Sequence, residues 1–288
     1  MRTRLAAVAL LAVTAVWGST FFLIKDLLDR VPATDFLAVR FAIAFTAMFL
    51  LAPRAIARLS PEVRRRSSYA GGVYGVAQIL QTVGLGHTDA SVSGFITGLY
   101  VVATPVLASL AFRQRVSRTV WIAVALSTVG LAILSLRGFT IGFGEMITAA
   151  GAILYAVHII ALSRWSSAAD AYGMATIQMG VIAALSLVVA APGGLSLPHR
   201  SDDWIAILYM ALAAGALAMI LQTWAQSQLN AARSALLMTM EPVFAATFAI
   251  VLGTEGLTWR LLLGGSLVLV AMVLAEASDR PETAVPLP

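Results

Sequence analysis

Long hydrophobic stretches, separated by short connections that hold most of the charges, run along the whole chain. A transmembrane α-helix needs about 17 to 25 predominantly apolar residues. Uncharged stretches of this kind span Leu5–Ile24, Ser67–Gly86, Ala90–Phe112, Thr119–Leu136, Ala171–Ala191 and Trp204–Leu229. Shorter stretches, or stretches with one or two ionisable groups, span Phe36–Leu51, Ile141–Ser163, Ser234–Gly253 and Leu261–Ala275. The pattern predicts an all-α integral membrane protein with about ten transmembrane helices.

The chain also contains an internal repeat. The tetrapeptide Ile-Leu-Gln-Thr occurs at Ile79–Thr82 and again at Ile220–Thr223, and the same register pairs Ala90 with Ala231 and Gln114 with Glu255. Repeats of this length in a membrane chain are typical of transporter halves. Because five helices per repeat is an odd number, we expect two five-helix repeats of inverted topology. They occupy residues 1–138 and 139–278, and residues 279–288 are expected to form a disordered cytoplasmic tail.

Composition narrows the class of protein further. A hydrophobic fraction of 60%, a charged fraction of 11% and a mean hydropathy of +0.89 exclude a soluble domain, since such domains carry about a quarter charged residues. The stretch Leu5–Ile24 follows two arginines, as a signal peptide would, but it is longer than a normal signal core and belongs to the repeat. The absence of cysteine excludes disulfides and thiolate metal sites. We expect no metal and no cofactor.

Most arginines fall on one side of the predicted membrane. If the N-terminus is cytoplasmic, that side receives thirteen of them: Arg2, Arg4, Arg54, Arg58, Arg64, Arg65, Arg66, Arg113, Arg115, Arg118, Arg164, Arg233 and Arg280. The other side receives Lys25, Arg30, Arg137, Arg200 and Arg260. Cytoplasmic connections are enriched in Lys and Arg, so we expect a multi-pass protein of the bacterial inner (plasma) membrane with both termini cytoplasmic. Topology and anionic lipid account for the pI of about 10.1, and no nucleic-acid partner is implied.

Four passages resemble a known family. They are Trp17–Lys25 in the first stretch, Phe36–Phe41 with an arginine before an aromatic residue, Glu241–Ala245, and Gly253–Thr258. In their order and spacing these passages are similar to the EamA-type transporters of the drug/metabolite transporter superfamily. The chain departs from the family pattern at Gln114, where the family often has a glutamate. It also has Tyr155-Ala156 where the second repeat would carry a tryptophan-glycine pair.

The resemblance implies a ten-helix carrier. Its first, third, fourth, sixth, eighth and ninth helices would surround a central cavity, with the fifth and tenth packed behind. Within the superfamily the chain looks most like bacterial amino-acid exporters, including exporters of aromatic amino acids. A fused chain already supplies both halves, so we expect a monomer whose partners are the lipid bilayer and a small-molecule substrate.

Ionisable residues, among them Arg40, His158 and Glu241, lie inside the predicted membrane helices, where a charge costs about 2.5 to 3.5 kcal/mol on insertion scales. Arg40 either snorkels or pairs with a carboxylate or carbonyl, or it captures a substrate carboxylate. Glu241 either sits against a carbonyl freed by Pro242, carries a proton, or meets an ammonium group. His158 shares a helical face with Tyr155 and Gly151, and is expected to line a cavity.

Polar and aromatic residues form stripes at helical spacing. Tyr74, Gln78 and Gln81 follow one face, as do Gln222 and Gln226, and amides facing lipid would be left unsatisfied. These amides either bind substrate or join neighbouring helices. Trp17, Tyr100 and Tyr155 offer rigid surfaces that stack on a flat ligand or a cation. The substrate-binding candidates are therefore Trp17, Tyr74, Gln78, Gln81, Tyr100, Tyr155, His158 and Gln222.

Prolines and glycines mark places of special backbone geometry. Pro105 and Pro242 each remove a backbone donor inside a predicted helix, so we expect breaks or packing kinks there. With Arg40 and Glu241 they are the candidates for coupling or gating. The spacings Gly71-to-Gly75 and Gly94-to-Gly98 permit close helix packing.

Sequence motifs of common enzyme classes and of ATP-driven pumps are absent from the chain. The chain has no HExxH zinc pair, no GxSxG nucleophile elbow and no phosphate-binding GxxxxGK[ST] loop, so we expect neither an enzyme nor an ATP-driven pump. The sequence favours export of amino acids and related metabolites by alternating access. A drug or other-metabolite carrier of the same superfamily and a passive channel are the alternatives. Proton coupling through Glu241 and His158 and facilitated movement down a gradient both remain open.

Overall fold

The computed structural model describes residues 2–88, 90–113, 116–135, 142–251 and 257–277. Within these ranges the chain is helical and contains no strand, as the hydrophobic pattern predicts. The helices of the first half are α1 (Arg2–Gly18), α2 (Phe21–Leu28), α3 (Ala33–Leu51), α4 (Pro53–Ala57), α5 (Pro61–Gly86), α6 (Ala90–Gly98), α7 (Tyr100–Phe112) and α8 (Arg118–Ser135). Those of the second half are α9 (Phe143–Trp165), α10 (Ala171–Ala190), α11 (Ser201–Ala211), α12 (Ala218–Gln226), α13 (Ala231–Met238), α14 (Glu241–Val251) and α15 (Trp259–Ala277). The pairing of Gln114 with Glu255 and the tail 279–288 lie outside the described residues.

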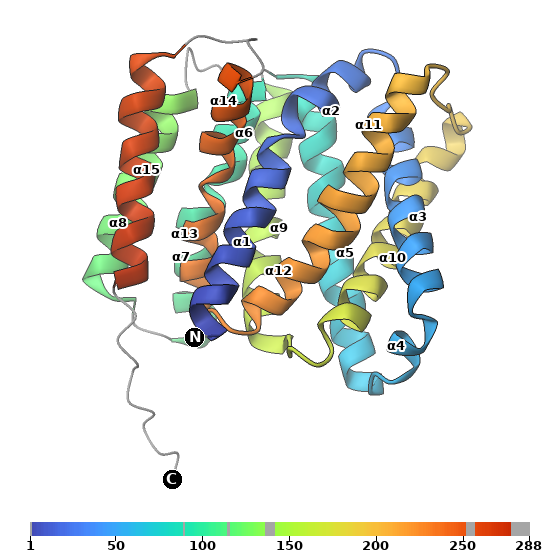
Figure 1. Cartoon of the computed structure of the whole chain (residues 1–288), viewed down its shortest axis with the longest axis horizontal. Coiled ribbons are helices and arrows are strands. Elements are labelled where there is room, and N and C mark those ends of the chain that lie inside the picture. Colours follow the sequence, from blue (N-terminus) through green and yellow to red (C-terminus); the bar gives the residue numbers. More distant parts are fainter. Residues whose placement is uncertain (1, 89, 114–115, 136–141, 252–256, 278–288) are drawn as a thin grey trace.

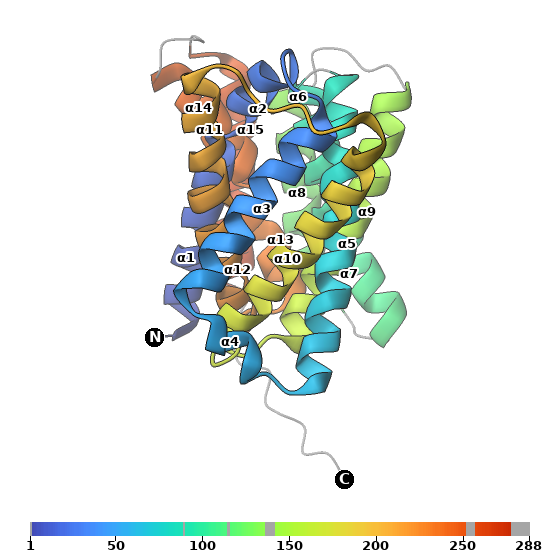
Figure 2. The same ribbon diagram turned by 90° about the vertical axis from the view of Figure 1, so that its right-hand side faces the viewer.

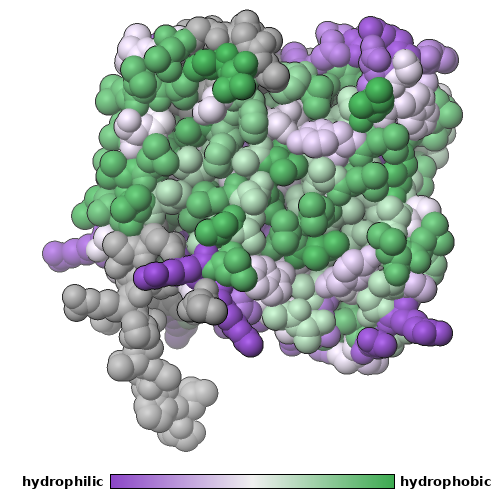
Figure 3. All heavy atoms as spheres, in the orientation of Figure 1, coloured by the Kyte–Doolittle hydropathy of each residue, from purple (hydrophilic) through white to green (hydrophobic). Residues whose placement is uncertain are grey.

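The helices stand side by side as one bundle (Figures 1 and 2). We call the end where α1 begins the N-terminal end; α2, α6, α11 and α14 lie at the opposite end. Figure 3 shows hydrophobic side chains across the middle of one face and hydrophilic ones gathered toward the two ends. In the described residues, six helical stretches are long and apolar enough to cross a membrane: Arg2–Leu28, Ala33–Leu51, Val92–Phe112, Phe143–Trp165, Ala171–Gly193 and Ser201–Gln226. The molecule is therefore built to lie in a bilayer.

Several predicted helices are interrupted. The stretch predicted from Ser234 to Gly253 is divided between α13 and α14 at Thr239 and Met240, and α6 passes into α7 at Leu99. Met240 and Leu99 correspond in the register that pairs Ile220 with Ile79, so the two interruptions occupy equivalent places. The first stretch is also divided, between α1 and α2, and a π-helical segment, Leu212–Leu217, joins α11 to α12.

The prolines do not cause these interruptions in the way the sequence suggested. Pro105 lies inside α7, which continues through it. Pro242 is the second residue of α14, where a helix needs no backbone donor from it. Of the two alternatives, a break or a packing kink, no break occurs at Pro105 within α7, while at Pro242 the break comes before the proline. A proline at the start of a new helix costs little, which explains its place directly after the interruption.

Helices of one half of the chain pack against helices of the other half. Helix α5 packs against α9, and its counterpart α12 packs against α1, the counterpart of α9. Helices α3 and α10 correspond to each other and pack together, as do α8 and α15. The pair α8 and α15 stands at the edge of the bundle, away from α3 and α10 (Figure 1). The helices that carry the polar stripes are thereby brought into the middle.

Three glycines allow neighbouring helices to cross closely. A Cβ atom added to Gly71 would lie 2.8 Å from the Cα of Gln178, and one added to Gly75 would lie 3.4 Å from the Cα of Ile182. Both contacts are between α5 and α10, so this GxxxG spacing acts in packing. A Cβ added to Gly18 would lie 2.7 Å from the carbonyl oxygen of Glu241, so the end of α1 touches the start of α14.

Local capping signals fix where the central helices begin. The hydroxyl of Ser60 accepts a hydrogen bond from the Val63 N–H at 3.3 Å at the start of α5. Asn230 accepts from the Arg233 N–H at 2.9 Å at the start of α13. At the start of α9 the Glu145 carboxylate accepts from the Gly142 N–H at 2.8 Å and from the Thr88 hydroxyl. These caps set the helical register, and therefore which face of each helix turns inward.

Candidate functional site

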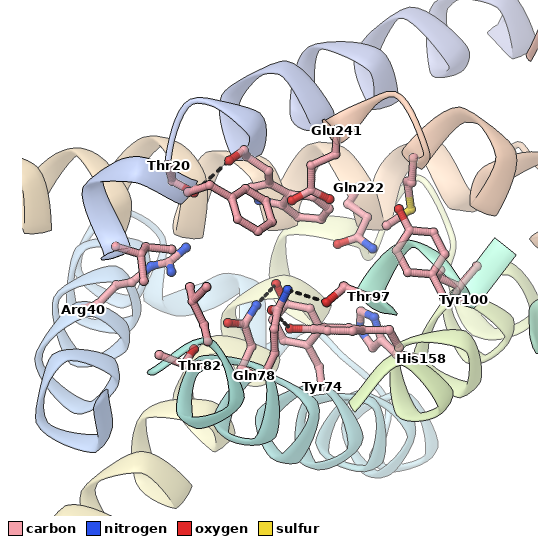
Figure 4. A pocket seen from close by; sticks show the side chains of 18 residues that line it. Thr20, Arg40, Tyr74, Gln78, Thr82, Thr97, Tyr100, His158, Gln222 and Glu241 are labelled. Carbon is pink, nitrogen blue, oxygen red and sulfur yellow. Dashed lines mark hydrogen bonds between the residues drawn. The ribbon is translucent and has the colours of Figure 1, made fainter. Parts of the chain in front are cut away.

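A polar cavity lies in the middle of the bundle and is lined by both halves of the chain (Figure 4). The cavity has a volume of about 60 Å³. The cavity is therefore narrow. Its lining residues are Trp17, Thr20, Phe21, Ile24, Arg40, Tyr74, Gln78, Gln81, Thr82, Leu85, Thr97, Tyr100, Tyr155, His158, Ile159, Gln222, Met238 and Glu241.

Exposure of the lining changes along the cavity. Phe21 and Ile24 of α2 and Gln78 of α5 are partly exposed, and α2 lies at the opposite end of the bundle. Gln222 is 0% exposed, and Met238 at the end of α13 is 4% exposed. The cavity is therefore more accessible from the opposite end and closed toward the N-terminal end.

Side chains of α5 and α9 form a hydrogen-bonded wall. The Gln78 amide donates to the Tyr74 hydroxyl at 2.8 Å, and the Tyr155 hydroxyl donates to the Gln81 amide oxygen at 2.6 Å. The Gln81 amide nitrogen in turn donates to the Thr97 hydroxyl of α6 at 3.1 Å. The rings of Tyr74 and Tyr155 meet edge to face at 5.5 Å. These bonds hold the polar stripe of α5 toward the cavity, as its spacing predicted.

Arg40 stands on α3 with its side chain turned into the bundle. It is only 4% exposed, and its Nε donates to the Met210 carbonyl oxygen at 3.1 Å. Its guanidinium carbon lies 5.1 Å from the centre of the Phe41 ring. Of the two structural roles proposed from the sequence, the carbonyl contact is present and snorkelling is not. In the described part of the chain, no carboxylate lies within 4 Å of Arg40.

Glu241 begins α14 and faces the same cavity (Figure 4). Among the described residues it forms no ion pair, and no hydrogen bond to its carboxylate is found. The cavity is therefore lined by one basic and one acidic side chain, each without an oppositely charged partner on the described protein. Figure 4 draws them on different sides of Gln78.

Two further groups facing the cavity lack partners. Gln222 of α12 is fully buried, and neither its amide nitrogen nor its amide oxygen has a hydrogen-bond partner among the described residues. His158 is 1% exposed; one ring nitrogen lies 2.8 Å from the Gln178 amide oxygen, while Nδ1 is unpartnered within the described ranges. An unpaired buried polar group costs about 1 to 3 kcal/mol, so a ligand or water that bonds these atoms would recover that energy.

Charged groups at the opposite end tie the loops together outside the cavity. Arg30 pairs with Asp26 and donates to Asp203 at 2.7 Å, and the hydrogen bonds that it donates to these two carboxylates hold its pKa above the usual value. The Lys25 ammonium donates to the Leu85 carbonyl at 2.9 Å, which links α2 to the end of α5. At the N-terminal end, the hydrogen bond from Arg65 lowers the pKa of Glu62.

All eight residues predicted to bind substrate line this one cavity, together with Arg40 and Glu241. Pro105 and Pro242 do not line it. Sequence reasoning did not name eight of the lining residues as site residues: Thr20, Phe21, Ile24, Thr82, Leu85, Thr97, Ile159 and Met238. Thr20 belongs to the Trp17–Lys25 passage and Thr97 lies within the Gly94-to-Gly98 spacing, so both carried a signal, whereas Met238 looked like an ordinary apolar residue.

Apolar helices that surround a cavity with polar side chains are typical of helical membrane transporters. The sequence model of the EamA-like transporter family matches residues 4–136 and again residues 142–276. The chain is also 30% identical over 276 residues to a protein of Archaeoglobus fulgidus described as an uncharacterized transporter. The aligned region covers 94% of this chain and 85% of that protein. The chain therefore belongs to the EamA-like transporter family of the drug/metabolite transporter superfamily.

A solved crystal structure has the same fold. It superimposes with a TM-score of 0.80 at 17% identity, and the match covers 94% of this chain and 96% of that one. At this identity the likeness concerns the fold alone.

Proposed function

We propose that the protein exports neutral amino acids, aromatic ones included, and related metabolites by alternating access. The observation that carries this proposal is that one basic and one acidic side chain, Arg40 and Glu241, line the same cavity, each without an ion-pair partner in the described ranges. A buried charge is stabilised only when it is paired or hydrogen-bonded. A zwitterion supplies a carboxylate for the guanidinium and an ammonium group for the carboxylate, directly or through water.

The aromatic lining supports the aromatic part of the proposal. Trp17, Tyr100 and Tyr155 border the cavity, and the Trp17 indole nitrogen is held by a hydrogen bond of 2.9 Å to the Ala214 carbonyl. A ring fixed in this way offers a rigid surface for stacking on a flat side chain. The two partnerless amide atoms of Gln222 provide one donor and one acceptor for polar groups of the solute.

The narrowness of the cavity bears on the alternative of a drug carrier. Drug-sized ligands occupy pockets of about 300 to 1,000 Å³, whereas this cavity has a volume of about 60 Å³. A cationic drug would also leave Arg40 unpaired and would be repelled by it. Small zwitterions therefore fit the described cavity better than bulky cations do.

For topology we propose ten membrane spans in two inverted five-helix repeats, residues 1–138 and 139–278, and a functional monomer. Arginines concentrate at the N-terminal end, on the start of α1, on α4, on the start of α5 and at the adjoining ends of α7 and α8. The opposite end has Lys25, Arg30, Arg200 and Arg260. This bias favours cytoplasmic termini in a bacterial inner membrane. The cavity would then be more accessible from outside the cell.

Competition for uptake tests the charge requirement. Proteoliposomes holding the purified protein are given labelled phenylalanine, tryptophan, threonine or methionine, with an excess of unlabelled competitor. Phenylalanine should compete well, whereas phenethylamine, which lacks the carboxylate, and phenylpropionate, which lacks the amine, should compete at least about tenfold more weakly. Saturable uptake blocked equally by all three compounds would contradict the zwitterion proposal. No uptake of any amino acid would contradict amino acids as substrates.

A further inference from the structure

Buried polar side chains continue beyond the cavity toward the N-terminal end. Gln226 lies one helical turn beyond Gln222 on α12, and both side chains are 0% exposed. The amide nitrogen of Gln226 contacts only the sulfur of Met238, at 3.6 Å, and its amide oxygen has no partner in the described residues. Ser234, one turn before Met238 on α13, is also fully buried with an unpartnered hydroxyl.

These side chains form two stripes, Gln222 and Gln226 on α12 and Ser234 and Met238 on α13. The Gln226 amide touches the Met238 sulfur, so the two stripes meet at that point. One residue of each stripe, Gln222 or Met238, lines the cavity, so the polar surface is continuous with it. Helix α1 packs against both α12 and α13.

Their burial is costly in this conformation. A serine or threonine hydroxyl inside a helix can bond a carbonyl of its own preceding turn, so an unpartnered Ser234 is a weak indication alone. A glutamine amide has two donors and two acceptor sites, and leaving it unsatisfied costs about 1 to 3 kcal/mol for each unpaired group. Two such amides in succession on one helix face point to a second conformation in which water or solute satisfies them.

We propose that Gln222, Gln226 and Ser234 line the half of the pathway that is closed here, and that Gln226 and Ser234 form a second solute subsite. This inference rests on the alternating access of the proposed function. When α1 separates from α12 and α13, the stripes become hydrated at the N-terminal end. Amides and a hydroxyl carry no charge, so the subsite bonds polar groups of the solute without the charge selection made at Arg40 and Glu241.

Because the chain has no cysteine, single cysteine substitutions report accessibility without background. The test variants are Gln226→Cys and Ser234→Cys, each treated with a membrane-impermeant, charged methanethiosulfonate reagent applied to either face of reconstituted vesicles without solute. Thr176→Cys is the matched control, because Thr176 is also fully buried but its hydroxyl is satisfied by the Tyr172 carbonyl at 2.8 Å. Thr3→Cys, at an exposed position at the N-terminal end, identifies that face.

Both test cysteines should react at least about tenfold faster than Thr176→Cys, and only from the face that labels Thr3→Cys. Minor conformations are commonly populated at about 0.1 to 10%, which an overnight reaction detects. Ser234→Cys replaces only the hydroxyl oxygen by sulfur, so this variant should fold. It therefore reports accessibility even if Gln226→Cys does not fold. Reaction no faster than Thr176→Cys in a variant that elutes as folded protein would overturn the subsite, as would labelling from the other face. Labelling as expected without uptake of any amino acid would leave the pathway standing and remove only the proposed solute.

Discussion

At the scale of the residue, the most direct test concerns Arg40. Its charge is buried on α3 and only its Nε has a protein acceptor in the described part of the chain. Replacing it by glutamine would remove the proposed charge-assisted contact with the solute carboxylate, and such a contact is worth about 1.5 to 3 kcal/mol. Arg40→Gln should therefore weaken the apparent affinity for phenylalanine by about 10- to 150-fold in an uptake assay.

Arg40→Lys is the matched control. Lysine keeps the charge but loses the planar fork, so its affinity should fall between those of the wild type and the glutamine variant. Phenylalanine amide, a cation without a carboxylate, should bind Arg40→Lys as weakly as it binds the wild type, and it should lose no affinity in Arg40→Gln, where the repelling charge is gone. An unchanged affinity for phenylalanine in Arg40→Gln, with the protein still folded, would assign Arg40 to structure alone.

Proton coupling is the second prediction at this scale. Glu241 and His158 are the two ionisable side chains other than Arg40 and the tyrosines that line the cavity. If a proton is exchanged for solute, a Glu241→Gln, His158→Gln double variant should lose the dependence of uptake on an imposed pH gradient. The single variants show which residue is responsible. A double variant with the pH dependence of the wild type would exclude both residues as proton carriers, and facilitated movement would then be favoured.

Much of the site was predictable from residue spacing. A stripe such as Tyr74, Gln78 and Gln81 has to face the protein interior, because amides facing lipid would be unsatisfied. The sequence could not show that the free atoms would be those of Gln222 while Gln81 would be bonded to Tyr155 and Thr97. Those pairings depend on how distant helices meet. Met238 carried no polar signal and was missed for that reason.

At the scale of the element, the crossing of α5 and α10 gives a matched pair of substitutions. A Cβ atom at Gly71 would lie 2.8 Å from backbone of α10, whereas a Cβ at Gly72 meets nothing within 4 Å. Overpacking costs about 1 to 3 kcal/mol, so Gly71→Ala should lower the midpoint of thermal unfolding in detergent. Gly72→Ala should leave the midpoint unchanged or raise it, because alanine favours helix by about 1 kcal/mol. Equal midpoints for the two variants would show that the crossing adjusts freely.

Helix existence was predictable from the hydrophobic pattern, but helix continuity was not. The stretch from Ser234 to Gly253 reads as one apolar run, yet it divides at Thr239 and Met240. Apolar composition is satisfied equally by one helix or by two in sequence, so it contains no information about the break. The prolines suggested breaks, but Pro105 is accommodated within α7 and Pro242 only begins α14. Packing of the end of α1 on the start of α14 at Gly18 is a tertiary contact that the local sequence does not state.

At the scale of the whole molecule, the internal repeat was the strongest sequence signal. The Ile-Leu-Gln-Thr pair set a register, and the exchange of contacts between α5 with α9 and α12 with α1 follows the same register. The family match to residues 4–136 and 142–276 divides the chain at nearly the same place. Substrate and direction of transport have no such signal, because they depend on a few side chains in a cavity that both halves build.

The central claim is that this molecule is a carrier that binds a neutral amino acid and exposes it alternately to each side. Counterflow tests it most directly: proteoliposomes loaded with unlabelled phenylalanine are diluted into a trace of labelled phenylalanine, with Arg40→Gln in parallel. The account predicts a transient accumulation of label above its outside concentration, saturable and strongly reduced in Arg40→Gln. Uptake that rises in proportion to concentration and is unaffected by the internal load would indicate a passive pore and would contradict the account.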